Sequence, residues 1–216
     1  MYINSMKIKK SINSIINAKQ IDKPYRHWAF NDFLDQDVLD QILDLNIPIG
    51  VNAGIRNDRH DQADRAYLTK DVLEKYPIFK EVEEILINKD FKKTLESKLG
   101  INLQGYPHLR AEFIQDVSPF YLIPHTDETA KAFTLLIYLS KDMDPNTMGT
   151  ELYENEDTSG VMSKAPFISN SGYIFIPDGQ TTWHGLRKVE FKGVRKVFIV
   201  NYVAPEWRDR HQLYNP

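Results

Sequence analysis

The residues best suited to chemistry lie in the stretch 122–127, where His125 and Asp127 stand two positions apart. A second histidine, His184, follows much later in the stretch 181–185. Residues i and i+2 of a β-strand point to the same face, so His125 and Asp127 can reach one ion from the end of one strand. Two imidazoles and one carboxylate leave positions open on a metal, and this donor set is typical of non-haem Fe(II) sites. The spacing predicts a metal centre made by these three residues.

Such ligands need strands to hold them, and the C-terminal half has the pattern of short strands separated by turns. The run 133–139 is apolar at nearly every position, as in a strand buried on both faces. A cluster of Asp, Pro, Asn and Gly at 142–149 indicates a turn. Many short strands with turns between them favour a sandwich or barrel, and a jelly roll can enclose a small-molecule site. The expected strands are 109–117, 120–125, 133–139, 149–153, 172–177 and 194–204.

The N-terminal half is predicted to be mainly helical. Ile8, Ile12 and Ile15 fit a short amphipathic helix, and residues 27–33 alternate as a strand does. Gly100 is a reasonable residue to end a helix. Further helices are expected at 34–45, 71–86 and 90–99, with Pro77 near a helix start or break. The polar stretch 49–65 fits either a substrate-facing loop or a solvated connection.

Length and composition favour one globular domain. The chain has 216 residues, of which 42% are hydrophobic and 26% charged, enough for one domain with a sizeable core. We expect an α+β, mainly β fold in a single domain, 1–216. Within it, residues 1–108 give mainly helical support and lid elements, 109–204 a double-stranded β-helix (jelly roll), and 205–216 a C-terminal tail.

Charge and residue content exclude several classes of function. The net charge of −3 gives no global basic field that would recruit nucleic acid. The chain has no cysteine, which excludes disulfides, thiolate metal sites and cysteine nucleophiles. No stretch has the apolar length needed to span a membrane, and the first twenty residues lack the core of a signal peptide. We expect a cytoplasmic protein with no nucleic-acid or membrane partner.

Several motifs, in this order and spacing, resemble the Fe(II)/2-oxoglutarate-dependent oxygenases, in particular the prolyl-hydroxylase-like branch. The resemblance covers roughly residues 109–204, and the N-terminal half is only loosely similar to the helical support found in that family. The motifs are His125-x-Asp127, then 131–139, 149–153, 173–177, Trp183-His184-Gly185 and 193–195.

The resemblance implies a catalytic iron and a cosubstrate. His125, Asp127 and His184 are expected to be the catalytic Fe(II) ligands, with 2-oxoglutarate and O₂ as cosubstrates. Oxidation of a substrate would then be coupled to release of succinate and CO₂. Related halogenating enzymes lack the carboxylate ligand, so Asp127 favours hydroxylation or desaturation over halogenation.

The resemblance also implies residues that bind 2-oxoglutarate. Arg195 stands eleven residues after His184 (195 − 184 = 11) and is expected to hold the distal carboxylate, because a guanidinium fork matches a carboxylate with two parallel hydrogen bonds. The alternative is a surface ion pair for Arg195, with Lys196 as the anchor. Tyr138 is expected to bond the same carboxylate, or else to be a core tyrosine. Thr134 and Gln115 are further candidates for the cosubstrate pocket, and Gln115 stands near a position where this branch often has tyrosine.

Substrate contacts are predicted for Lys131, Arg110 and Trp183. Strand alternation turns Trp183 away from the face of His184, so packing is the alternative for Trp183. Asn201 stands six residues after Arg195 (201 − 195 = 6), where nucleic-acid demethylases of the family carry a second arginine. Its presence argues against base repair.

Two other functions compete with a 2-oxoglutarate-dependent hydroxylase. The first is a non-catalytic jelly-roll binding module with a retained metal site, against which the intact ligands and Arg195 count. The second is a cupin-type dioxygenase, which would use three histidines and no cosubstrate and is disfavoured by Asp127. The sequence leaves open a small-molecule, peptidyl, sugar or lipid-linked substrate, and also the oligomeric state.

Overall fold

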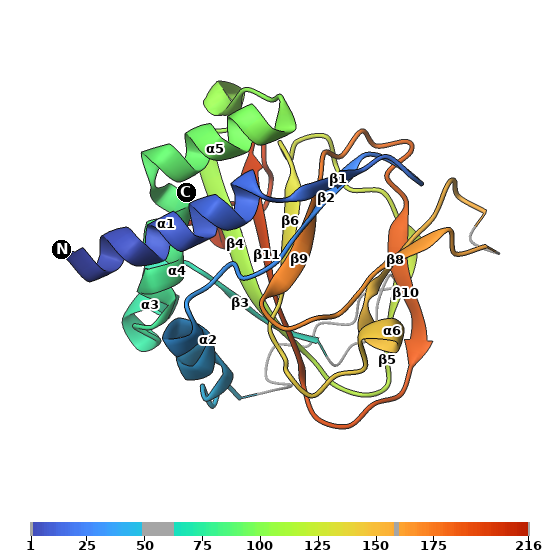
Figure 1. Cartoon of the computed structure of the whole chain (residues 1–216), viewed down its shortest axis with the longest axis horizontal. Helices are drawn as coiled ribbons and strands as arrows, with labels where there is room; N and C mark the ends of the chain where they lie inside the picture. The colour runs from blue at the N-terminus through green and yellow to red at the C-terminus, as the bar shows by residue number, and fades with distance from the viewer. Residues whose placement is uncertain (1, 49–62, 158–159, 216) are drawn as a thin grey trace.

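The computed structural model describes residues 2–48, 63–157 and 160–215, and these form two antiparallel sheets that face each other (Figure 1). Most of the polar stretch 49–65 therefore lies outside the described residues. The larger sheet has the order β1-β2-β9-β6-β11-β4-β3 and the smaller sheet the order β5-β10-β7-β8. Among the described strands no pairing joins the two sheets, so the jelly roll is not a closed barrel. The predicted mainly β fold with supporting helices is confirmed.

The strands of the two sheets come from most of the chain. The larger sheet is made by β1 (Lys19–Ile21), β2 (His27–Phe30), β3 (Ala63–Tyr67), β4 (His108–Asp116), β6 (Thr134–Tyr138), β9 (Ser171–Phe175) and β11 (Arg195–Val203). The smaller sheet is made by β5 (Phe120–His125), β7 (Thr150–Leu152), β8 (Ser163–Ala165) and β10 (His184–Val189).

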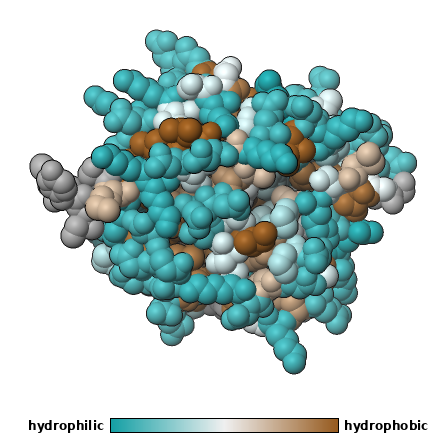
Figure 2. All heavy atoms as spheres, in the orientation of Figure 1, coloured by the Kyte–Doolittle hydropathy of each residue, from teal (hydrophilic) through white to brown (hydrophobic). Residues whose placement is uncertain are grey.

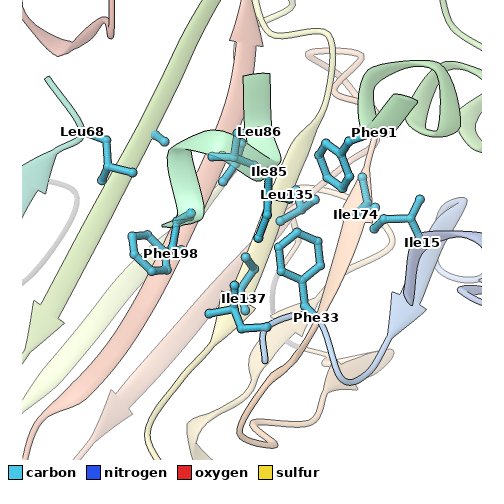
Figure 3. Close-up of a cluster of buried hydrophobic side chains, with 14 of the residues drawn as sticks. Ile15, Phe33, Leu68, Ile85, Leu86, Phe91, Leu135, Ile137, Ile174 and Phe198 are labelled. Carbon is cyan, nitrogen blue, oxygen red and sulfur yellow. The ribbon is translucent and has the colours of Figure 1, made fainter. Parts of the chain in front are cut away.

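Helices cover the outer face of the larger sheet, away from the smaller one (Figure 1). They are α1 (Tyr2–Ile16), α4 (Phe79–Ile87) and α5 (Lys89–Leu99), with α2 (Gln36–Leu43) and α3 (Lys70–Lys75) beside them. Figure 3 shows Phe91 and Ile85 of these helices directed at Leu135, Ile137 and Ile174 of the sheet. Residues alternate between the two faces of a strand. Every second side chain of these strands therefore packs against the helices, and the others point into the space between the sheets.

Local sequence signals explain where these helices begin and end. Asn88 starts α5, since its side-chain oxygen accepts hydrogen bonds from the backbone N–H groups of Asp90 and Phe91. Gly100 ends α5 with a φ of 70°, a left-handed conformation that glycine adopts without steric cost. Pro77 falls in the break between α3 and α4, as its lack of a backbone N–H favours.

The structure departs from the expected division of the chain at both ends. The N-terminal segment, expected to be mainly helical with a strand at 27–33, contributes β1 and β3 to the larger sheet in addition to the predicted β2. The expected tail 205–216 packs against β4 through a bridge between Arg110 and Leu213, and contains a 3₁₀ turn, η2 (Arg210–Gln212). The expected turn at 142–149 contains the short helix α6 (Pro145–Met148).

The surface of the face drawn in Figure 2 is mostly hydrophilic, with small separate apolar spots. Within the part of the chain that the structure describes, no helix has the length and apolar character required to cross a membrane.

Candidate metal centre and its pocket

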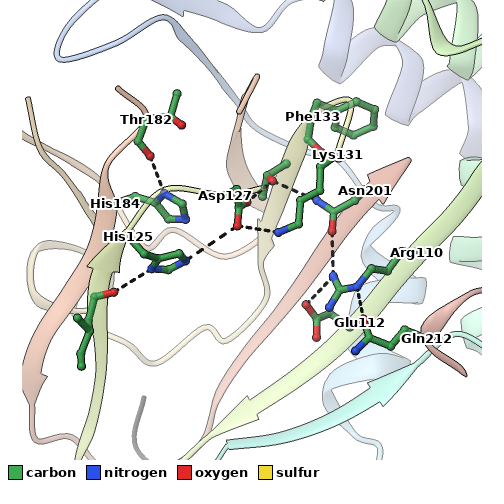
Figure 4. Close-up of polar contacts among 12 residues, drawn as sticks. Arg110, Glu112, His125, Asp127, Lys131, Phe133, Thr182, His184, Asn201 and Gln212 are labelled. Atoms are coloured by element: carbon green, nitrogen blue, oxygen red, sulfur yellow. Dashed lines mark hydrogen bonds and ion pairs between the residues drawn. The ribbon is translucent and has the colours of Figure 1, made fainter. Parts of the chain in front are cut away.

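The predicted metal ligands come together at one end of the smaller sheet. His125 is the last residue of β5 and His184 the first residue of β10, and the two are direct partners in the antiparallel pairing of these strands. Their rings lie 4.5 Å apart between centroids. Asp127 follows two residues after His125, and one ligand atom from each of the three residues lies within 4.8 Å of the others (Figure 4).

Close approach of β5 and β10 depends on Gly185. A Cβ atom on this residue would lie 2.7 Å from the carbonyl oxygen of Leu122 and 2.9 Å from Cα of Pro124. Real Cβ atoms do not approach backbone so closely, so the residue after His184 must be glycine for the two strands to pack as they do.

Backbone carbonyls orient both imidazoles. Nδ1 of His125 lies 2.8 Å from the carbonyl oxygen of Ile123, and Nδ1 of His184 lies 2.9 Å from that of Thr182. A carbonyl can only accept, so in the neutral rings Nδ1 donates and Nε2 keeps its lone pair for a metal.

The turn before His184 is held by Asp178. Its carboxylate accepts hydrogen bonds from the backbone N–H groups of Gln180, Thr181 and Thr182. Burial opposes ionisation, but the hydrogen bonds from Thr181 and from these backbone groups outweigh it and lower the pKa of Asp178 to about 2. The turn is therefore ordered by an ionised carboxylate at neutral pH.

Electrostatics keep His184 and Asp127 in their metal-binding protonation states. Burial lowers the pKa of His184 to about 4, so its ring is neutral at pH 7. Burial alone would raise the pKa of Asp127, but the charge of Lys131 and hydrogen bonds from Lys131 and Thr134 hold it well below its usual range. A neutral His184 and an ionised Asp127, together with the imidazole of His125, fit a divalent metal ion.

Both oxygens of Asp127 are oriented by neighbours. Lys131 Nζ donates to Oδ1 at 2.6 Å and Thr134 Oγ1 donates to Oδ2 at 2.5 Å. Thr134 in turn accepts a hydrogen bond from the side-chain amide of Asn201, which is fully buried. Thr134, expected in the cosubstrate pocket, thus lines the pocket and also positions a metal ligand.

A cavity of about 260 Å³ runs between the sheets from these ligands to Arg195. Its middle is apolar, with Leu122, Leu136, Leu186, Val197 and Ile199 on the walls. Charged and polar residues gather at both ends, among them Arg110, Glu112 and Asp116 of β4. A ligand in this cavity would therefore touch the metal ligands and Arg195 across an apolar middle.

Arg195 lines the cavity, on the face of β11 that alternation predicted for it. Its Nη1 lies 2.6 Å from Oδ2 of Asp116, and its guanidinium lies over the rings of Phe120 and Phe167. Lys196 points to the other face of β11, where Nζ donates to the carbonyl oxygen of Leu43. Strand alternation therefore excludes Lys196 as the anchor for a ligand in the cavity.

Tyr138 lies close to Arg195, with the guanidinium carbon 6.0 Å from the centre of its ring. Its hydroxyl donates to Thr150 Oγ1 at 2.8 Å and accepts from the Thr150 backbone N–H at 3.2 Å. Tyr138 is fully buried, so Thr150 stands between the phenol and the cavity, and a bond to a carboxylate requires the phenol to change partner.

Gln115 does not fit the role expected of it. Its amide donates to the carbonyl oxygen of Ile47 at 3.2 Å, on the helix-covered face of the larger sheet. In β4 the cavity-facing residues are Arg110, Glu112, Ile114 and Asp116, and Gln115 falls between two of them. Alternation along β4 is the sequence signal that separates the two faces. It places Asp116, rather than Gln115, on the face that lines the cavity.

Two of the three expected substrate contacts line the cavity. Lys131 and Arg110 do so, each already bonded to other residues. Trp183 is half-buried and is not among the cavity-lining residues, and its indole N–H donates to the carbonyl oxygen of Gln180 at 2.7 Å. Trp183 thus lies outside the cavity lining and is not a fully buried core residue, and its contact with a substrate stays a prediction.

Several cavity residues were not anticipated, and they form a charged wall beside the metal ligands (Figure 4). Glu112 accepts from Arg65 at 2.5 Å and pairs with Arg110 at 3.0 Å. Arg110 also donates through Nε to Gln212 at 2.7 Å, and its guanidinium lies 5.4 Å from the centre of the Trp207 ring. The C-terminal segment thus contributes to the site, which no short motif could indicate.

Comparison with known proteins bears on the fold. No protein-family model matches the chain, and no curated protein matches it by sequence. A solved prolyl hydroxylase from Trichoplax adhaerens, in complex with a peptide fragment of the hypoxia inducible factor oxygen degradation domain, matches with a TM-score of 0.58 at 16% identity, over 94% of this chain and 91% of that chain. A prolyl-4-hydroxylase from Pseudomonas putida matches with a TM-score of 0.52 at 12% identity, over 91% and 98%.

A third match is HygX from Streptomyces hygroscopicus, solved with nickel and 2-oxoglutarate bound. It has a TM-score of 0.55 at 11% identity, over 84% of this chain and 85% of that chain. At such identities the likeness concerns the fold. This chain has the fold of the prolyl-hydroxylase-like 2-oxoglutarate oxygenases, in agreement with its sequence motifs.

Proposed function

We propose that this protein is an Fe(II)- and 2-oxoglutarate-dependent dioxygenase that hydroxylates a small-molecule, peptidyl or sugar substrate. One observation carries the proposal: a single cavity joins the His125, Asp127 and His184 cluster to Arg195. A dicarboxylate with a 2-oxo group needs both ends of such a cavity, a metal for the oxo acid and a cation for the far carboxylate.

Each set of residues has a part in this function. His125, Asp127 and His184 would hold Fe(II), which when bound supplies the oxidising chemistry, coupled to conversion of 2-oxoglutarate and O₂ into succinate and CO₂. Arg195 would bind the far carboxylate, and apolar walls such as Leu136 and Val197 would keep water from the cosubstrate. Thr134 and Lys131 keep the Asp127 carboxylate in place.

The charged wall supports a polar substrate. Arg110 and Glu112 lie on the cavity wall close to Lys131 and Asn201, on the metal side of the cavity (Figure 4). Glu112 is paired with both Arg110 and Arg65, so the wall offers hydrogen-bonding groups held in fixed positions. Among the solved structures of similar fold, one holds a peptide and a HygX structure holds hygromycin B.

Succinate formation tests the proposal. Purified protein given Fe(II), O₂ and 2-oxoglutarate should release succinate slowly, and faster with a substrate present. His184→Ala should abolish this release because one metal ligand is lost, whereas His108→Ala, at the start of β4, should not.

Two other outcomes would assign a different function. O₂ uptake that does not depend on 2-oxoglutarate would favour a cupin-type dioxygenase. Metal binding with neither binding nor turnover of 2-oxoglutarate would favour a non-catalytic binding module.

A further inference from the structure

The anchoring arginine already has a buried acidic partner. Asp116 ends β4 opposite Arg195 in the strand pairing, and Oδ2 lies 2.6 Å from Arg195 Nη1. Asp116 is only 1% exposed and Arg195 only 6%, and both line the cavity. Any carboxylate that reaches Arg195 must therefore approach a second carboxylate.

The other oxygen of Asp116 has no partner. Oδ1 is buried and makes no hydrogen bond to any described residue. A buried acceptor without a donor costs free energy, so this oxygen points to a missing hydrogen-bond donor. The donor could come from a ligand or from a proton on the carboxyl group itself.

A ligand carboxylate at Arg195 would share that cation with Asp116. The ionisable groups that act on Asp116 are Arg195 of β11, Arg65 of β3 and Glu112 of β4. Arg65 bonds Glu112 at 2.5 Å, a carboxylate that also pairs with Arg110, whereas Arg195 bonds Asp116 directly at 2.6 Å. Arg195 would thus face two carboxylates, and two carboxylates that share one site do not both stay ionised at low cost.

We propose that Asp116 is a cosubstrate-binding residue, which takes up one proton from solution when 2-oxoglutarate binds and donates a hydrogen bond to its far carboxylate. The inference rests on the proposed function. It goes further in assigning a proton to the binding step and a second residue to recognition of the dicarboxylate. Arg195 then balances one negative charge, that of the ligand carboxylate, while the carboxyl group of Asp116 is neutral.

The direction of the pH dependence follows from linkage. Burial raises the pKa of Asp116 even though Arg195 lowers it, and a second carboxylate would raise it further. A group whose pKa rises on binding takes up a proton, so the affinity is highest at low pH. It falls as pH rises from the pKa of the free protein toward the higher pKa of the complex, by up to about tenfold per pH unit.

Calorimetry can count this proton directly. Protein loaded with Fe(II) without O₂ is titrated with 2-oxoglutarate in buffers of different ionisation enthalpy, from about pH 6 to about pH 8.5. Metal is bound before the titration, so protons released by the metal ligands are not counted. We expect uptake that approaches one proton per ligand within this range, and an affinity that falls with pH.

Matched ligands and variants test whether Asp116 is the group that takes up the proton. The analogue 2-oxopentanoate, in which a methyl group replaces the far carboxylate, should bind without proton uptake. Asp116→Asn keeps the shape and a donor, and should bind 2-oxoglutarate roughly tenfold more tightly at about pH 8, with no pH dependence. Glu74→Gln removes an exposed carboxylate from α3, outside the cavity lining, and should retain the uptake.

The outcomes separate this inference from the proposed function. Binding without proton uptake by the wild-type protein, with 2-oxoglutarate and 2-oxopentanoate alike in pH dependence, overturns the role of Asp116 and leaves the proposed function standing. No binding of 2-oxoglutarate at any pH overturns the proposed function itself. The wild-type measurements decide the matter even where a variant fails to fold.

Discussion

At the scale of single residues, the site depends on side chains that are each held by a second group. The imidazoles of His125 and His184 are oriented by backbone carbonyls, and Asp127 by Thr134 and Lys131. Such support matters because a ligand that can rotate binds its metal less tightly. Sequence reasoning found the ligands but not all of their supports, since hydrogen-bond partners depend on tertiary structure.

Removal of the hydroxyl that supports Asp127 should weaken the metal site. Thr134→Val keeps the shape of the side chain but leaves Asp127 Oδ2 without its donor. We expect the dissociation constant for Fe(II) to rise roughly 10- to 100-fold. Thr134→Ser keeps the hydroxyl and should stay near wild type. Equal metal affinity in Thr134→Val and wild type would show that Lys131 alone positions Asp127.

Truncation of Arg195 should cost cosubstrate affinity and stability together. Loss of one member of a buried charge pair costs roughly 2–5 kcal/mol, which corresponds to roughly 30- to 4,000-fold weaker binding of 2-oxoglutarate by Arg195→Ala. The same change leaves Asp116 without a partner, which destabilises the fold. Addition of Asp116→Asn should restore the melting temperature but not the affinity. Lys196→Ala is the control, and loss of 2-oxoglutarate binding in that variant would reverse the assignment.

At the scale of elements, periodicity predicted most helices and strands. The odd or even position of a residue along its strand then sets whether its side chain faces the cavity or the helices. The apolar spacing of Ile8, Ile12 and Ile15 predicted α1, and the run 133–139 predicted β6. β8 was missed because three residues carry no readable period. Gln115 was misplaced by one position, and in a strand such a slip moves a side chain to the opposite face.

Contact between β5 and β10 should fail when Gly185 gains a side chain. In Gly185→Ala the new Cβ meets the Leu122 carbonyl and Pro124, so β10 must move away and carry His184 from His125. We expect a loss of roughly 1–3 kcal/mol in the free energy of unfolding, together with weaker metal binding. Gly105→Ala is matched, because a Cβ there meets nothing within 4 Å. Unchanged metal affinity in Gly185→Ala would mean that the two strands adjust without displacing His184.

At the scale of the whole molecule, the cavity is assembled from residues far apart in the chain. Arg65 of β3, Arg110 of β4 and Gln212 of η2 meet on one wall, while the metal ligands come from the facing sheet and the turn after β5. Motifs locate the ligands because their spacing is local, but this wall exists only once the sheets and the C-terminal segment have packed. The charged wall therefore could not be predicted from the sequence.

The net charge of the whole molecule also argues against a nucleic-acid partner. The net charge of −3 gives no attraction to phosphate backbones, and Asn201 is buried and bonded to Thr134 and Arg110 rather than placed to contact a ligand. We expect no tight binding to single- or double-stranded DNA or RNA in a mobility-shift assay. Binding that weakens steeply with salt would contradict this, since that dependence is the mark of phosphate contacts.

The most direct test of the central claim is a titration of 2-oxoglutarate into the Fe(II)-loaded protein without O₂, followed by visible absorption. A 2-oxo acid that chelates Fe(II) gives a charge-transfer band that neither component has alone. The account predicts a saturable band in the wild-type protein, no band in His184→Ala, and in Arg195→Ala a band that needs far more 2-oxoglutarate. A wild-type protein that binds Fe(II) but gives no band at any 2-oxoglutarate concentration would contradict the account.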